Sequence, residues 1–298
     1  MTINPLSSKL VSTSETTSYE LIDSGDGLRF ERFGNTRLIR PDPEILWPKR
    51  LPKEIWDNAD ATFTRIGERG TWNSAKPLPE SWPLSYDSLT FSIRPTSFKH
   101  TGVFPEQLPH WQWIDNLIKN AGRPINVLNL FAYTGGATLA ALRAGASVCH
   151  VDGSKKAVEW AKENSRLSSL EDKPVRWIVD DVITFITKEQ KRGHFYDAII
   201  LDPPSFGHGP KDELWKIERD FSKLLSICES VLSTTPLFVL INGYASGYSP
   251  ITLANCLQEI TKKYSGSIEY GENTILESGK DGRLLPSGVY TRWQSSSK

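Results

Sequence analysis

The residues best suited to carry chemistry form one short run, Asp202, Pro203, Pro204 and Ser205. The run follows the apolar segment YDAIIL, which predicts that it stands at the end of a buried strand. Two prolines fix the backbone and the direction of its carbonyl groups, and the Asp202 carboxylate can accept a hydrogen bond from a planar amine or ring N–H. A nitrogen held by this carboxylate and the Pro203 carbonyl would keep its lone pair free to attack an electrophile. A rigid turn without a chemical role is the alternative.

Glycines and acids follow three other apolar runs. Gly135 and Gly136 come after INVLNLF, Asp152 after SVCHV, and the pair 180–181 (both Asp) after VRWIV. Because the glycines lack a Cβ, the backbone can turn sharply there and approach a ligand closely. Asp152 could accept hydrogen bonds from both hydroxyls of a ribose. Asp181 could address an adenine edge, cap the following helix, or do both. The spacing is not G-x-G-x-x-G, so the usual dinucleotide fingerprint is missing.

The elements that must position these residues alternate along the chain. Apolar strands are predicted at 125–131, 147–151, 175–179, 196–201 and 237–241. Helical stretches are predicted around 136–144, 154–167, 182–191, 213–232 and 250–264. This alternation predicts a doubly wound α/β sheet covered on both faces, with ligands at the carboxyl ends of its strands. Two late strands, near 267–275 and 284–293, have no crossover helix between them and are therefore expected to pair antiparallel as a hairpin-like edge.

The first hundred residues have a different character. Residues 1–17 are rich in Ser and Thr and are expected to be a loose tail. Short β-rich segments bounded by turn residues predict a small β-rich domain over 18–100, with the α/β domain over 101–298. Six of the ten tryptophans lie before residue 114, either filling a thin core or offering a stacking surface for a base. Residues 27–53 hold seven Lys or Arg against three acids. This excess of positive charge indicates either a solvated surface or a phosphate-facing patch.

Composition excludes several classes of protein. The chain has 298 residues, 35 Lys plus Arg and 35 Asp plus Glu, and a formal net charge of zero, which argues against a generally basic nucleic-acid coat. No apolar run approaches the ~20 residues of a membrane span, and the polar start lacks a signal-peptide core. The cysteines, at 149, 228 and 256, have no paired spacing, so neither a disulfide framework nor a cysteine zinc site is expected. We expect a cytoplasmic globular protein without a metal.

Five motifs together resemble the class I S-adenosylmethionine-dependent methyltransferases. Within this class, the motif sequences are similar to those of the group containing bacterial large-subunit ribosomal RNA base methyltransferases. The motifs are TGVFPEQ at 101–107, FAYTGGATLAAL at 131–142, VDGSKKAVEWAKEN at 151–164, DDV at 180–182 and LDPPSFG at 201–207. The resemblance covers residues 100–298 well and the β-rich segment less specifically. It implies a Rossmann-like methyltransferase sheet with an antiparallel edge strand, preceded by the small β-rich domain.

The resemblance also implies roles for individual residues. Those that would hold S-adenosylmethionine are Gln107, Phe131, Ala132, Tyr133, Thr134, Gly135, Asp152, Gly153, Asp181, Val182 and Asp202. The catalytic turn would be Asp202, Pro203, Pro204 and Ser205, and Phe206, His208 and Lys211 would contact the substrate. In the amino-methyltransferases with a similar motif, an aromatic residue follows the prolines directly and stacks on the base. In this chain Ser205 takes that place and Phe206 comes one residue later.

Methylation of cytosine C5 is disfavoured by the cysteine positions. That reaction needs a cysteine nucleophile, which in the resembling enzymes lies just after strand five, where this chain has Asn242, Gly243 and Tyr244. The expectation is therefore methylation of a nucleobase nitrogen in RNA, ribosomal RNA first, without a covalent cysteine intermediate. The alternatives are the same chemistry on a small molecule or protein side chain, a nicotinamide-dependent oxidoreductase, and an RNA-associated protein that binds the cofactor without turnover.

Overall fold

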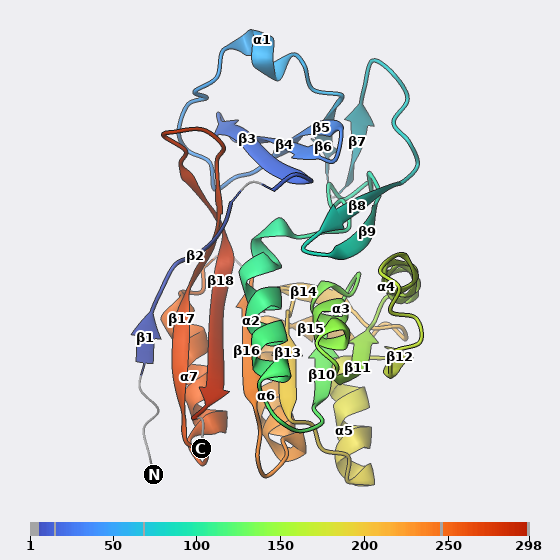
Figure 1. The fold of residues 1–298 in the computed structure, drawn as a ribbon, viewed down its shortest axis with the longest axis vertical. Helices are drawn as coiled ribbons and strands as arrows, with labels where there is room; N and C mark the ends of the chain where they lie inside the picture. The colour runs from blue at the N-terminus through green and yellow to red at the C-terminus, as the bar shows by residue number, and fades with distance from the viewer. Residues whose placement is uncertain (1–5, 15, 68, 245–246, 297–298) are drawn as a thin grey trace. The chain divides into compact units, whose positions relative to one another are not determined.

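The computed structural model describes residues 6–14, 16–67, 69–244 and 247–296. The chain forms two compact units (Figure 1). The first contains Met1–Val11, Pro109–Asn273 and Gly288–Lys298, and the second contains Ser12–Leu108 and Thr274–Ser287. The sequence places one boundary at residue 100, whereas the second unit extends to Leu108 and also takes the far end of the late hairpin.

The first unit is built on a mixed sheet with strand order β1-β17-β18-β16-β13-β10-β11-β12, and β2 also pairs with β17. Its strands are β1 (Leu6–Ser8), β2 (Val11–Thr13), β10 (Asn126–Leu130), β11 (Ser147–Asp152), β12 (Val175–Val179), β13 (Ala198–Leu201), β16 (Phe238–Gly243), β17 (Gly266–Leu276) and β18 (Leu284–Ser295). The five strands from β12 to β16 pair in parallel, and β18 pairs antiparallel with β16. These pairings confirm the predicted parallel sheet with an antiparallel addition.

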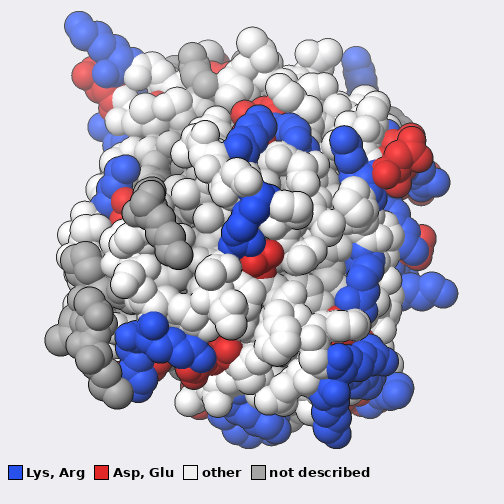
Figure 2. Space-filling model, turned by 60° about the horizontal axis from the view of Figure 1, so that its bottom comes forward, with Lys and Arg blue, Asp and Glu red and all other residues white. Residues whose placement is uncertain are grey.

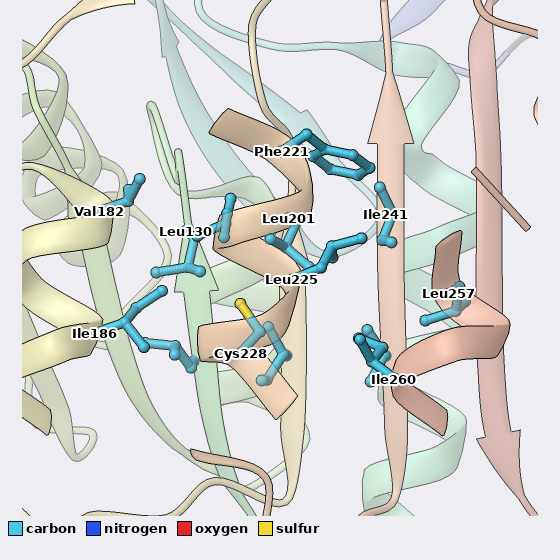
Figure 3. Packing of buried hydrophobic residues seen from close by; sticks show 14 of the residues in the cluster. Leu130, Val182, Ile186, Leu201, Phe221, Leu225, Cys228, Ile241, Leu257 and Ile260 are labelled. Carbon is cyan, nitrogen blue, oxygen red and sulfur yellow. The ribbon is translucent and has the colours of Figure 1, made fainter. Parts of the chain in front are cut away.

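Helices cover both faces of this sheet. They are α2 (Leu108–Lys119), α3 (Gly136–Arg143), α4 (Lys155–Leu167), α5 (Val182–Arg192), α6 (Ile217–Val231) and α7 (Pro250–Thr261). On one face, apolar side chains of α5, α6 and α7 pack with Leu130, Leu201 and Ile241 of the strands (Figure 3). On the other face, Trp113 of α2 lies 5.1 Å from the Phe238 ring. The doubly wound architecture is therefore confirmed.

Alternation along the strands explains these two faces. In β10, Leu128 and Leu130 belong to the core cluster under α5, α6 and α7. Asn129 between them donates a hydrogen bond of 2.9 Å to Thr138 Oγ1 of α3, on the opposite face. Successive side chains of a strand point to opposite faces, and each buried aliphatic side chain contributes about 1.5–3 kcal/mol. Burial on both faces of the sheet thus explains the continuous apolar runs in the sequence.

The first strands correct the expectation of a loose tail over 1–17 for residues 6–8 and 11–13, while residues 1–5 and 15 of that range lie outside the described residues. Residues 6–8 form β1, which pairs in parallel with β17 in the register Leu6↔Ile268 to Ser8↔Tyr270. The side chains of β1 are exposed, so no apolar pattern marks it in the sequence. Backbone hydrogen bonding alone builds this strand. Because β1 pairs with β17, the outer strand of the sheet is β1, and the late hairpin β17–β18 is not the edge that the sequence predicts.

The second unit contains a five-stranded sheet, β3-β4-β5-β6-β7, and a separate pair, β8–β9. The elements are β3 (Tyr19–Gly25), β4 (Leu28–Phe33), β5 (Thr36–Pro41), α1 (Lys53–Trp56), β6 (Ala61–Ile66), β7 (Arg69–Asn73), β8 (Trp82–Tyr86), β9 (Leu89–Ile93) and the 3₁₀ turn η1 (Pro105–Gln107). Buried aromatic rings fill this unit: Tyr19 lies 5.2 Å from Phe33 and 6.1 Å from Tyr86. The predicted β-rich segment is therefore present as its own sheet.

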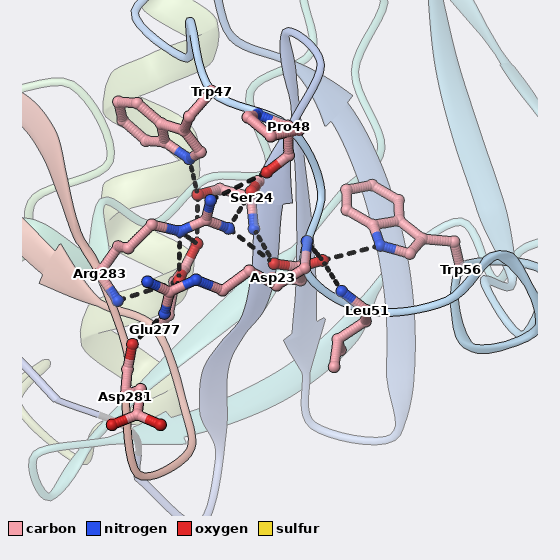
Figure 4. A network of polar contacts seen from close by, with 10 residues as sticks. Asp23, Ser24, Trp47, Pro48, Leu51, Trp56, Glu277, Asp281 and Arg283 are labelled. Atoms are coloured by element: carbon pink, nitrogen blue, oxygen red, sulfur yellow. Dashed lines mark hydrogen bonds and ion pairs between the residues drawn. The ribbon is translucent and has the colours of Figure 1, made fainter.

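A buried polar network explains why residues 274–287 belong to this unit. Arg283 donates to Asp23 Oδ1 at 3.0 Å and to Glu277 Oε2 at 2.9 Å. Asp23 Oδ2 also accepts from the Trp56 indole and the Leu51 amide, each at 2.9 Å (Figure 4). Buried charges are stable only when paired and hydrogen-bonded. This network therefore fixes the hairpin end against β3, a long-range pairing that no local pattern reveals.

No helix among the described residues combines the length and hydropathy that crossing a bilayer requires.

Candidate active site

Four strand ends of the first unit carry the candidate site residues. Leu130 at the end of β10 is in register with Leu201 of β13 and with Val151 of β11. The residues that follow therefore stand side by side, and the Asp202 amide donates to the Leu130 carbonyl at 3.4 Å. The order of the strands reverses between β10 and β13, which is where parallel α/β sheets bind ligands.

The loop after β10 has an unusual backbone. Phe131 has a φ of 55° and Tyr133 a φ of 46°, and Gly135 follows with 88°. The left-handed region costs a residue with a Cβ roughly 1 kcal/mol, so two such residues persist only because their surroundings hold them. This loop is a strained segment placed at the switch point of the sheet.

Several contacts hold the strained loop in place. The buried Asn164 of α4 donates its amide to the Thr134 carbonyl at 2.9 Å. The Gly135 amide donates to the Ala132 carbonyl at 2.9 Å. A Cβ built on Gly135 would lie 3.1 Å from the Ala161 Cβ. Phe131, Ala132, Tyr133, Thr134 and Gly135 therefore form one fixed cradle at the start of α3.

Asp152 ends β11 beside this cradle. Its Oδ2 accepts from the Tyr133 amide and its Oδ1 from the Ser154 amide, both at 2.8 Å. Burial raises the pKa of Asp152, and the two amide hydrogen bonds oppose that shift. Each carboxylate oxygen has two lone pairs, so both oxygens can still accept a ligand hydroxyl. Asp152 thus orders the loop and offers the acceptors that a ribose needs.

The acids after β12 have structural partners. Asp181 caps α5, because its Oδ1 accepts from the Thr184 amide at 2.8 Å. Asp180 pairs with Lys188, 2.7 Å away, and its amide donates to the Asp152 carbonyl at 3.3 Å. The Val182 side chain lies in the core cluster. The capping alternative for Asp181 is therefore present, and only the backbone of Val182 is open to a cofactor role.

Two hydrogen-bond donors from residues that follow the turn after β13 hold its backbone. The Pro204 carbonyl accepts a hydrogen bond of 2.7 Å from the Trp215 indole, and the Ser205 carbonyl accepts one of 3.1 Å from the Ile217 amide. Asp202 is half-buried and Pro203 is buried, whereas Pro204 and Ser205 are exposed. The turn therefore presents its exposed prolyl face and its carboxylate in a fixed geometry.

Trp215 belongs to a hairpin that the sequence does not predict. Strand β14 (Phe206–His208) pairs antiparallel with β15 (Leu214–Lys216), and α6 begins only at Ile217, not at residue 213. The loop expected here is closed by Gly209 and Glu213, whose backbones bond at 2.7 Å. The buried Trp215 ring lies 5.0 Å from Phe131, so one side chain contacts both the cradle and the proline turn.

The hairpin carries the expected substrate residues. The side chain of Phe206 is 53% exposed, and its ring lies 5.2 Å from that of His208. Lys211 sits in the turn, where its amide donates to Glu213 at 2.8 Å. A Cβ on Gly153 would meet the Gly209 Cα and the His208 carbonyl, both at 3.5 Å. The first unit therefore brings all the expected site residues together except Gln107, which belongs to the second unit.

The cysteines are placed for packing. Cys228 lies among the aliphatic side chains of the core (Figure 3), and burial raises the pKa of its thiol well above the usual range. Burial also raises the pKa of Cys149 to about 11. Cys256 is partly buried on α7, and burial raises the pKa of its thiol as well. A thiolate nucleophile needs the opposite shift.

The site therefore fits a nucleoside-containing cofactor. It offers a carboxylate with free lone pairs, a glycine turn at the start of a helix, and a rigid acceptor turn within the same sheet edge. Among the described residues, no group of three or more His, Cys, Asp and Glu side chains could hold a metal ion.

Comparison with known proteins adds independent findings. A family model described as S-adenosylmethionine-dependent methyltransferase matches residues 38–273. The chain is 40% identical to the SAM-dependent methyltransferase from Agrobacterium tumefaciens, whose crystal structure aligns with a TM-score of 0.94 over 99% of this chain and 97% of that one. The crystal structure of SMU.776 complexed with SAH shares the fold, with a TM-score of 0.68 and 20% identity over 90% of this chain and 71% of that one.

Two curated relatives are both called "Ribosomal RNA large subunit methyltransferase K/L". The one from Pseudoalteromonas atlantica is 36% identical over 137 residues, covering 45% of this chain and 18% of the relative. The one from Syntrophotalea carbinolica is 30% identical over 167 residues, covering 55% and 22%. The matched region thus spans about a fifth of the length of these relatives.

Proposed function

Because the chain belongs to the S-adenosylmethionine-dependent methyltransferase family, we propose that it methylates a nucleobase nitrogen in RNA, ribosomal RNA first. The observation that carries the proposal is the Trp215 hydrogen bond, which fixes the Pro204 carbonyl beside the cradle. A rigid turn that begins with a carboxylate and continues with a backbone acceptor suits a planar N–H group. No step requires a cysteine.

The cofactor, when bound, supplies a methyl group on a positively charged sulfur, which is a good leaving group. In the proposed site, Asp152 would accept hydrogen bonds from the ribose hydroxyls, with Gly153 next to it. Asp181 and the Val182 backbone would hold the adenine, and the 131–135 cradle would hold the methionine part.

Asp202 and the Pro203 carbonyl orient the acceptor nitrogen. They would accept its N–H groups and leave its lone pair free for the methyl group that the bound cofactor would supply. Asp202 or water would take the proton that the nitrogen gives up. Positioning of this kind supplies much of the rate of a methyl transfer. Ser205 borders the acceptor, Phe206 can stack on the base, and His208 and Lys211 can contact base or phosphate.

The names of the curated relatives support RNA as the substrate class. An RNA substrate would place the enzyme in the cytoplasm. The face seen in Figure 2 carries Lys and Arg in small groups, many beside Asp or Glu, rather than one continuous basic surface. Recognition would then depend on local groups of cations, as the zero net charge also suggests. A small molecule or protein side chain is the second candidate.

The decisive experiment replaces Asp202 by Asn. Asn keeps the size and one acceptor oxygen, so the turn should survive. The substrate is ribosomal RNA from a strain that lacks this protein. If the carboxylate acts in the transition state, the rate of single-turnover methyl transfer should fall about 10²-fold, while cofactor affinity changes little. The control is Asp172→Asn, an exposed carboxylate between α4 and β12.

Mass spectrometry of the modified nucleosides then identifies the methylated atom. A methyl group on carbon, or a normal rate in Asp202→Asn, contradicts the proposed mechanism. Methylation of a small molecule or a protein in place of RNA contradicts the substrate class but not the role of Asp202.

A further inference from the structure

A short loop of the second unit, residues 96–100, is closed on itself and attached to β7. The Thr96 hydroxyl donates to the His100 carbonyl at 2.8 Å. The Gly70 amide of β7 donates to the Ser97 carbonyl at 2.9 Å, and the Trp72 indole donates to the Thr96 carbonyl at 2.9 Å. These hydrogen bonds therefore hold the loop backbone, and the side chains that it carries, in a fixed position.

The tip of this loop exposes an aromatic ring. The side chain of Phe98 is 51% exposed, and the Arg69 guanidinium lies 5.8 Å from its ring centre. The next residue, Lys99, has a φ of 67°, a conformation that residues with a Cβ rarely adopt. A ring held at the surface beside a guanidinium can stack on a planar ligand group.

Cations gather around the same loop. The pKa of His100 is lowered to about 4 by burial and by the charges of Arg40, Lys99 and Arg65, among others. Burial and the neighbouring charges of Arg29 and Arg40 also lower the pKa of Lys99. His100 is therefore neutral at pH 7, and the potential at the loop is positive.

Two acids of the neighbouring β4–β5 segment are already paired: one, Glu31, is on β4, and the other, Asp42, follows β5. Glu31 is buried and pairs with Arg40 at 2.7 Å, and Asp42 pairs with Arg29. Arg65 and Arg69 are exposed and form no ion pair with any residue that the structure describes. The Arg69 guanidinium beside the ring and the Arg65 guanidinium near His100 thus have no ion-pair partner among the described residues.

We propose that Arg65, Arg69, Phe98, Lys99 and His100 form a surface that binds a single-stranded segment of the RNA substrate. Arginines neutralise phosphates while an aromatic ring stacks on a base, the combination by which proteins hold single strands. Neutral His100 can donate to or accept from a base edge. The inference rests on the proposed RNA substrate and deepens it, since it gives the second unit a part in recognition.

The test compares two triple variants of the full chain. Arg65→Ala/Arg69→Ala/Phe98→Ala removes the surface, and Lys173→Ala/Lys191→Ala/Phe195→Ala removes two cations and an exposed ring from the first unit. Binding to a fluorescent single-stranded RNA of about 10 nucleotides is measured by anisotropy over a range of salt. We expect at least tenfold weaker binding for the first variant and a salt slope smaller by about 1.4, from two lost phosphate contacts. Cofactor affinity should be unchanged in both.

The outcomes separate the two proposals. If the wild-type protein binds and methylates RNA but the surface variant binds as tightly as the control variant, the surface is wrong and the function stands. If the wild-type protein neither binds nor methylates RNA, both are wrong. Unchanged far-UV circular dichroism and melting temperature show that the variants fold. Restored binding in Arg65→Lys/Arg69→Lys/Phe98→Trp, which keeps charge and stacking, would exclude a merely structural role.

Discussion

The indole of Trp215 donates a 2.7 Å hydrogen bond to the Pro204 carbonyl, while its ring lies 5.0 Å from Phe131. One side chain therefore contacts both the proline turn and the 131–135 cradle. Trp215→Phe keeps the ring contact and removes the donor. We expect single-turnover methyl transfer to slow about tenfold, which corresponds to ~1.4 kcal/mol of lost positioning, with cofactor affinity nearly constant.

The matched control is Trp47→Phe in the second unit, which loses an indole hydrogen bond of 3.0 Å to Ser24. A similar loss of rate in both variants would show that Trp215 acts through general stability alone.

Replacing Asp152 should weaken cofactor binding and also loosen the loop. Asp152→Ala removes a charge-assisted acceptor worth roughly 1.5–3 kcal/mol, so calorimetric titration should show at least tenfold lower affinity for S-adenosylmethionine. The carboxylate also accepts the Tyr133 and Ser154 amides, so we expect a stability loss of about 1–2 kcal/mol in denaturant unfolding. The sequence alone suggests little change in folding. An unaltered affinity would remove Asp152 from the cofactor site.

The same residue predicts the pH dependence of cofactor binding. Burial raises the pKa of Asp152, and the ionised carboxylate is the form that accepts both ribose hydroxyls. Affinity is therefore complete above this raised pKa and falls as the pH drops through it. Titration calorimetry between pH 4 and 8 should show this loss in the wild type and a flat profile in Asp152→Asn. Equal profiles would assign the titration to another group.

A chain without cysteine should retain its chemistry. Cys149→Ala/Cys228→Ala/Cys256→Ala creates small cavities at two buried sites, so the melting temperature should fall by several degrees. The rate per folded molecule should remain within about threefold, because no covalent intermediate is proposed. A variant that folds, binds the cofactor and is inactive would overturn the nitrogen-acceptor mechanism.

The parallel strands and their end residues could be predicted from the sequence because burial leaves a local record. Each apolar run from INVLNLF to LFVLI matches a strand within a few residues, and strand ends place Asp152 and Asp202 at one edge of the sheet. The motif residues could be located in the sequence for the same reason, because they follow these strands.

Long-range pairings could not be predicted. Strand β1 has exposed side chains and is held by backbone bonds to β17. Trp215 stands in a polar segment, GHGPKDELW, whose hairpin depends on a turn closed by Gly209 and Glu213. The left-handed Phe131 and Tyr133 are likewise set by tertiary contacts, since neither residue type favours that conformation.

The pairing of β1 with β17 also has a kinetic consequence. Leu6–Ser8 and their partner residues, Ile268–Tyr270, are separated in the sequence by all the other strands and helices of the first unit except β18. Strand β1 can therefore pair only after residues 268–270 have been synthesised, and closing so long a loop slows folding. Until β1 pairs, residues 268–270 of β17 lack this neighbour and are open to pairing with another chain. Deletion of residues 6–8 should accordingly promote aggregation during expression more than it affects the finished active site.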